Sequence, residues 1–168
     1  CPGRVTDDAG EAGAGPARRV LVTGATGYVG SHLVPAVLDA GHTVLAASRS
    51  GTGAFLWDGE VETREFDVED EGLVARAVEG VDVVIYLVHS MASTDFERMD
   101  REAAIRMASA CERAGVEQII YLSGLVPDGE LSPHLRSRHE VEEIFLESAV
   151  PTIVLRASMV IGAGSTSY

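Results

Sequence analysis

A chain of 168 residues, 46% apolar and 23% charged, is long enough for one domain with a buried core. The net charge of −13 argues against a nucleic-acid-binding surface, which would be basic, and no apolar run reaches the length of about 18 residues that spans a membrane. The two cysteines, Cys1 and Cys111, do not resemble a disulfide framework, so we expect a cytoplasmic protein, and we predict no metal site.

Short apolar runs alternate with helical periodicity from residue 19 onward, and this pattern predicts a parallel α/β sheet. Residues 1–18 hold almost no large apolar side chain and are predicted to form a flexible tail before a folded domain over residues 19–168. Strands are predicted at about residues 19–23, 43–48, 61–66, 83–88, 118–122 and 152–156. Helices are predicted at about residues 28–40, 71–79, 95–114 and 134–148. The expected fold class is a doubly wound, mostly parallel sheet with helices on both faces.

Three glycines, Gly24, Gly27 and Gly30, stand at a spacing of three between the first strand and the first helix. Binding a dinucleotide pyrophosphate requires this order, because the glycines permit a sharp turn, close approach of backbone N–H groups and tight helix packing. The positive end of the helix then faces the phosphates. The predicted cofactor-binding residues of this turn are Gly24, Thr26, Gly27, Tyr28, Val29 and Gly30. The alternative is an ordinary glycine turn in an α/β protein.

Arg49, Asp67 and Val68 are also predicted to bind the nucleotide. Arg49 follows the second strand, where a protein that prefers NAD places Asp or Glu on the ribose hydroxyls. A guanidinium instead matches a 2′-phosphate in charge and geometry, so we predict NADP, with NAD less favoured. The alternative is a solvated surface arginine. Asp67, which precedes Val68 after the third strand, is expected either to accept from the adenine amino group or to cap the next helix.

The fourth and fifth strands end in residues expected near the ribose and the nicotinamide, since ligands bind at the carboxyl ends of such strands. Val88 and His89 are followed by Ser90 and Met91 in this position. His89 is either a catalytic acid or a hydrogen-bonded residue of the cleft wall, and the wall role is favoured. Ser123, after the fifth strand, is predicted to reach the same cleft.

These segments together resemble the short-chain dehydrogenase/reductase superfamily, in its atypical, NmrA-like NAD(P)H-binding branch. The resemblance covers about residues 19–168 and rests on TGATGYVG at residues 23–30, Arg49, Asp67, YLVHSM at residues 86–91 and YLSG at residues 121–124. The segment at residues 86–91 is similar to that of a bacterial and archaeal subgroup of predicted oxidoreductases. The resemblance implies a Rossmann sheet that holds NAD(P)H.

Active enzymes of the superfamily use a serine together with a Tyr and a Lys spaced YxxxK on one helix face. The chain has no lysine and no tyrosine on the matching helix, and the nearest alignment places His134 at the Tyr position and Arg138 at the Lys position. The resemblance therefore implies Ser123, His134, Arg138 and His89 as candidate catalytic residues. Because the usual pair is missing, binding of the cofactor is better supported than ordinary dehydrogenase catalysis.

The favoured function is hydride transfer between NADPH and a small carbonyl or alkene substrate. The alternative is a non-catalytic NADP(H)-binding redox sensor or structural subunit, and a nucleotide-sugar epimerase is less favoured. Family members close the substrate pocket with a region after the last strand, whereas this sequence stops at Tyr168. We therefore expect a fragment, an open pocket, or a pocket completed by a partner such as a second copy.

Overall fold

The computed structural model describes residues 15–51, 57, 61–89, 95–125, 130–158, 160 and 162. Within them, a six-stranded sheet has the order β3-β2-β1-β4-β5-β6, and every neighbouring pair is parallel. The strands are β1 (Arg19–Thr23), β2 (Thr43–Ser48), β3 (Glu62–Glu65), β4 (Val83–Tyr86), β5 (Gln118–Gly124) and β6 (Thr152–Ala157). The order reverses between β1 and β4, and doubly wound sheets bind ligands at the carboxyl ends of the strands at such a reversal.

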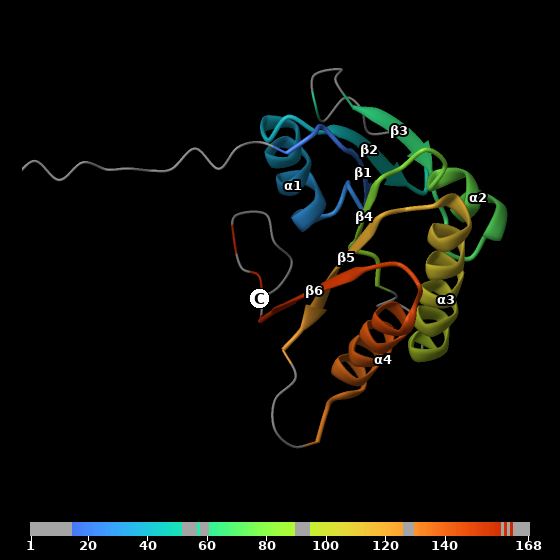
Figure 1. The fold of residues 1–168 in the computed structure, drawn as a ribbon. Coiled ribbons are helices and arrows are strands. Elements are labelled where there is room, and N and C mark those ends of the chain that lie inside the picture. The colour runs from blue at the N-terminus through green and yellow to red at the C-terminus, as the bar shows by residue number, and fades with distance from the viewer. Residues whose placement is uncertain are drawn as a thin grey trace, which may run out of the picture.

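Helices cover both faces of the sheet, as predicted. They are α1 (Tyr28–Asp39), α2 (Glu71–Ala77), α3 (Phe96–Ala114) and α4 (Pro133–Glu147). Figure 1 shows α1 on one side of the sheet and the other three helices on the opposite side. None of the helices in the described residues is long and apolar enough to cross a membrane.

Two apolar clusters, one on each face, hold the layers together. The larger cluster joins Leu21 and Tyr121 of the sheet to Met107 of α3 and Phe145 of α4. The smaller cluster packs Val34 of α1 against β1, β2 and β4. Cys111 belongs to the larger cluster, and this burial raises the pKa of its thiol to about 12.

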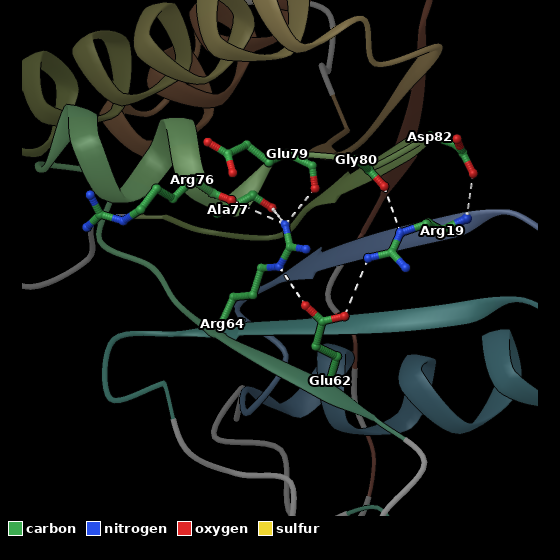
Figure 2. A network of polar contacts seen from close by, with 8 residues as sticks. All are labelled: Arg19, Glu62, Arg64, Arg76, Ala77, Glu79, Gly80 and Asp82. Atoms are coloured by element: carbon green, nitrogen blue, oxygen red, sulfur yellow. Dashed lines mark hydrogen bonds and ion pairs between the residues drawn. The ribbon is translucent and has the colours of Figure 1, made fainter.

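An arginine network fastens the edge strand β3 to its neighbours (Figure 2). Arg64 donates to three backbone oxygens at the end of α2 and just beyond it, those of Arg76, Ala77 and Glu79, at 2.8–3.2 Å. Its Nε also bonds Glu62 at 3.0 Å, and Glu62 contacts Arg19 at 3.4 Å. Arg19 starts β1 and donates to Gly80, before β4. This cation at a helix C-terminus and the linked ion pairs fix the amino ends of the strands.

The predicted elements agree with the structure apart from small shifts at their ends. The largest shifts are of two residues and occur in three elements. The helix α2 ends at Ala77 rather than at residue 79, and β5 continues to Gly124 rather than ending at residue 122, so Ser123 lies inside this strand and not after it. The strand β4 ends at Tyr86 rather than at residue 88. The reason is a side-chain bond: the Leu87 N–H donates to Oγ1 of Thr23 at 3.1 Å instead of continuing the strand ladder. The predicted tail lies mostly outside the described residues, but Arg18 is described and bonds His42 through its backbone N–H at 3.2 Å.

Candidate functional site

The glycine turn between β1 and α1 has the geometry that the sequence predicts. Gly24 has a φ of +65°, a conformation that favours glycine, and the Gly27 N–H donates to the Gly24 oxygen at 2.9 Å. A Cβ on Gly30 would lie 2.7 Å from the Ala25 oxygen, so the first turn of α1 packs on the backbone of the loop. The residues Gly24, Gly27 and Gly30 therefore do structurally what a phosphate-binding turn requires of them.

The N-terminus of α1 opens onto this turn. Its N-cap is Gly27, and no side chain in the described part of the chain caps the helix there; its first turn holds no acidic residue. The unpaired N–H groups and the positive end of the helix dipole thus remain available to an anion. The Tyr28 ring packs on His32 with centroids 4.7 Å apart, and a Cβ on Gly162 would overlap the Tyr28 hydroxyl. The chain beyond β6 therefore returns to the start of α1.

A cleft of about 640 Å³, here called the glycine-turn cleft, lies at the carboxyl ends of the central strands. Its lining includes nine residues of interest from β1 to β4 and their loops: Gly24, Thr26, Gly27, Ser48, Arg49, Asp67, Val68, Val88 and His89. The structure thus brings together predicted nucleotide-binding residues from four separate segments. Arg49 and Asp67 line the same cleft, after β2 and β3 respectively.

The two alternatives for Asp67 are resolved in part. Asp70, not Asp67, is the N-cap of α2, and it accepts from the Leu73 N–H at 2.9 Å. The prediction that Asp67 caps this helix is therefore wrong, because the helix starts one turn later. Asp67 instead accepts from the Glu69 N–H at 2.9 Å and faces the cleft.

A second cavity of about 530 Å³, here called the β5 pocket, adjoins the first. Both cavities are lined by Leu87 and His89. The β5 pocket also contains Val29, Leu122, Ser123, Gly124, Leu125, Leu135, Arg138, Ala157, Ser158 and Val160. A long ligand can therefore run from the glycine turn past His89 into the β5 pocket. Ser90 and Met91 lie outside the described residues.

Four side chains decide the chemistry of the β5 pocket and the layer below it. Burial and, to a smaller extent, the nearby Arg138 lower the pKa of His89 to about 3, so the imidazole is neutral at pH 7. The Ser123 Oγ is buried and has no hydrogen bond of good geometry in the described residues, although it is close enough to Glu142 to lower the pKa of that carboxyl. The hydroxyl also lies close enough to Tyr121 to act on the pKa of that phenol, so it stands between these two side chains and the pocket that it lines.

Beneath Ser123 lies an ion pair that the sequence did not predict. The side chain of Glu142 in α4 is 2% exposed and accepts two hydrogen bonds from Arg156 of β6. The Arg156 Nε donates to Glu142 Oε2 at 3.2 Å, and Nη2 donates to Oε1. Arg156 and Ser123 are direct partners in the sheet register. This contact lowers the pKa of Glu142. One signal for this buried glutamate is present in the sequence: Glu142 lies between Val141 and Phe145, two apolar positions of the same predicted helix.

His134 does not join the group at the β5 pocket. It is exposed in the first turn of α4, where its ring stacks on Phe96 at a centroid distance of 4.5 Å. Arg138, one turn further along the same helix, does line the pocket. Gly124 permits this approach, since a Cβ there would lie 2.8 Å from Cδ2 of Leu135 and 3.4 Å from Cδ of Arg138.

Comparison with known proteins agrees with the glycine turn and its cleft, which together have the features of a nucleotide-binding site. The family described as NAD(P)H-binding matches residues 24–160. The chain belongs to this family. It lies in the atypical branch of the short-chain dehydrogenase/reductase superfamily, so both the resemblance and the Rossmann-like fold class are confirmed. A nicotinamide nucleotide fits the turn, because Gly30 lets α1 pack directly on the loop and no side chain in the described residues caps the N-terminus of that helix.

Curated relatives share parts of this NAD(P)H-binding domain. A Mycobacterium tuberculosis 3 beta-hydroxysteroid dehydrogenase/Delta 5-->4-isomerase is 33% identical over 116 residues, which are 62% of this chain and 31% of that protein. A Caulobacter vibrioides ceramide reductase is 27% identical over 151 residues, 88% of this chain and 48% of that protein. The matched part of the chain thus spans a little under a third of the first relative and a little under half of the second.

Solved structures have the same fold. The Bordetella bronchiseptica enzyme WbmG in complex with NAD has a TM-score of 0.71 and 25% identity, over 84% of this chain and 53% of that one. A Citrobacter sp. triphenylmethane reductase complexed with NADP(H) has a TM-score of 0.74 and 22% identity, over 82% of this chain and 48% of that one. Neighbours with this fold therefore bind either nucleotide.

Proposed function

We propose that the protein is an NAD(P)H-dependent oxidoreductase that transfers a hydride between the nucleotide and a small carbonyl or alkene compound. The observation that carries the proposal is the continuity of the two cavities, which share Leu87 and His89. The glycine turn lies in one cavity, while Ser123 and Arg138 line the other. The nicotinamide supplies or accepts the hydride, and the protein supplies position, charge and proton.

The roles of the pocket residues follow from their ionisation. A reduced carbonyl gains negative charge on its oxygen, which the Arg138 guanidinium can stabilise but cannot protonate. Neutral His89 can donate a hydrogen bond but is not an imidazolium acid at pH 7. Ser123, whose hydroxyl lines the β5 pocket, is the proposed hydrogen-bond donor to the substrate oxygen; it gives its proton to that oxygen as the hydride arrives and is reprotonated by water. His134, as an exposed residue, has the weakest support as an acid.

Loss of NADPH absorbance with a panel of carbonyl and alkene compounds tests this activity. We expect Ser123→Ala to lower kcat about 100-fold, the size of a lost acid–base contact, with little change in nucleotide affinity. Ser109→Ala on α3, whose side chain lines none of the nucleotide-side cavities, is the matched control. Full activity of Ser123→Ala would contradict the proposed role. Tight nucleotide binding without turnover across the panel would favour the sensor alternative, which the missing Tyr–Lys pair supports.

We further propose NADP as the preferred nucleotide, with the 2′-phosphate bound by Arg49. Fluorescence titration should give tighter binding of NADPH than of NADH, and Arg49→Glu should weaken NADPH binding at least about tenfold while leaving NADH nearly unchanged. Arg76→Glu makes the same charge change at the end of α2, away from the cleft, and should preserve the preference. Equal binding of NADH and NADPH, unaltered in Arg49→Glu, would show that this assignment is wrong.

A further inference from the structure

One side chain gives the β5 pocket its charge. Among the described residues that line it, only Arg138 is charged near pH 7. The others are apolar residues, glycine, two serines and His89, which burial keeps neutral. The described lining of this pocket therefore has a net positive charge, on the side formed by β5 and α4.

Among the described residues, no carboxylate forms an ion pair with Arg138, although α4 carries several glutamates. Glu140 pairs with Arg101 of α3, and Glu142 pairs with Arg156 of β6. The guanidinium of Arg138 is therefore not neutralised by an ion pair with these glutamates. Its positive charge acts on His89, where it adds to the lowering of the His89 pKa by burial.

The oxidised and reduced forms of a nicotinamide nucleotide differ at the ring that such a pocket would receive. The oxidised ring carries a positive charge and the reduced ring is neutral, while the phosphates, riboses and adenine are the same in both. A fixed guanidinium beside the ring therefore repels only the oxidised form. Any contact made by the glycine turn or by Arg49 contributes equally to both forms.

We propose that Arg138 makes the protein select the reduced nucleotide over the oxidised one. The inference rests on the proposed function in one respect, namely that the nicotinamide end of the nucleotide enters the β5 pocket. This selection favours one direction of reaction: the protein binds the reduced nucleotide and releases the oxidised one, as a reductase does. In a protein without turnover, the same device would report the reduced fraction of the nucleotide pool.

The test compares dissociation constants for NADPH and NADP⁺, and for NADH and NAD⁺, by calorimetry on the whole chain. We expect the wild type to bind the reduced form about five- to tenfold more tightly, the effect of one charge in a partly solvated pocket. Arg138→Met should bring the ratio close to one, and Arg138→Glu should reverse it. Arg138→Lys keeps the charge and should retain the preference.

Arg136→Met provides the matched control, because Arg136 lies on the same helix in an exposed ion pair with Glu97 and lines neither cavity. Its ratio should equal that of the wild type. Added salt screens the repulsion between the guanidinium and the oxidised ring, so it should lower the ratio of dissociation constants in the wild type. The ratio for Arg138→Met should not change with salt.

The outcomes separate this inference from the proposed function. Binding of both forms with a ratio near one in the wild type, or an unchanged preference in Arg138→Met, overturns the selection by Arg138 and leaves the nucleotide site intact. Failure of the wild type to bind either form in either pair overturns the proposed function and the inference with it.

Discussion

Gly30 is the residue on which the contact between α1 and the glycine turn depends. A Cβ there would meet backbone atoms, the Cα of Ala25 at 2.6 Å and its oxygen at 2.7 Å, which cannot rotate aside. At Gly27 the nearest atom would be 3.1 Å away, so the restriction is graded along the turn. The spacing of these glycines in the sequence predicts this close packing, because only a hydrogen fits between the helix and the loop.

Gly30→Ala should therefore displace the first turn of α1 from the loop. We expect it to lower stability by about 1–3 kcal/mol, the usual range for overpacking, and to weaken NADPH binding more than about tenfold. Gly15→Ala, ahead of β1, is the control, since a Cβ there would meet no atom of the described residues within 4 Å. Urea unfolding and nucleotide titration measure both effects. If Gly30→Ala bound NADPH as tightly as the wild type, the glycine turn would not be part of the nucleotide-binding site.

At the scale of the elements, periodicity predicted the order of strands and helices because each element buries one face. The alternation of apolar runs with helical periodicity does not depend on how individual side chains pack. Right-handed crossovers between parallel strands then limit the possible strand orders. The residues at the carboxyl ends of the strands also follow from this topology, which is why Arg49, Asp67, His89 and Ser123 line adjoining cavities. The position of a residue along a strand is enough to place it at the site.

Contacts between elements distant in the sequence could not be predicted in this way. The helix from Pro133 to Glu147 was located, yet its rotation decides that Arg138 faces the β5 pocket while His134 stacks on Phe96. Alignment to the superfamily motif placed both residues at the site, because it follows spacing along the helix and not its contact with α3. Likewise, Arg64 capping the end of α2 depends on where β3 lies.

For the molecule as a whole, the two faces of the sheet are covered unequally. Three helices cover one face, whereas α1 alone covers the other, and the β6 side chains Ile153 and Leu155 are 44% and 53% exposed there. On the three-helix face, β6 is held to α4 through Arg156 and Glu142. This ion pair joins the last strand of the sheet to the helix that carries Arg138.

The pair between Glu142 and Arg156 predicts how global stability depends on pH. The pKa of Glu142 is lower in the folded state than the ordinary value of about 4.3, so its contribution is complete above that value and is lost as the pH falls through the folded pKa. Glu142→Gln should lower the free energy of unfolding near pH 7 by about 1 kcal/mol, a modest figure because Arg156 is half exposed and water screens the pair.

The difference between wild type and Glu142→Gln should then shrink as the pH is lowered below about 4, where the wild-type carboxyl takes up its proton. Urea unfolding from pH 7 to pH 3 measures this difference. Glu143→Gln is the matched control on the same helix, since its carboxylate is 61% exposed and lies 3.9 Å from His139, and it should change stability little at any pH. A constant difference across the pH range would mean that the Glu142 charge does not hold β6 to α4.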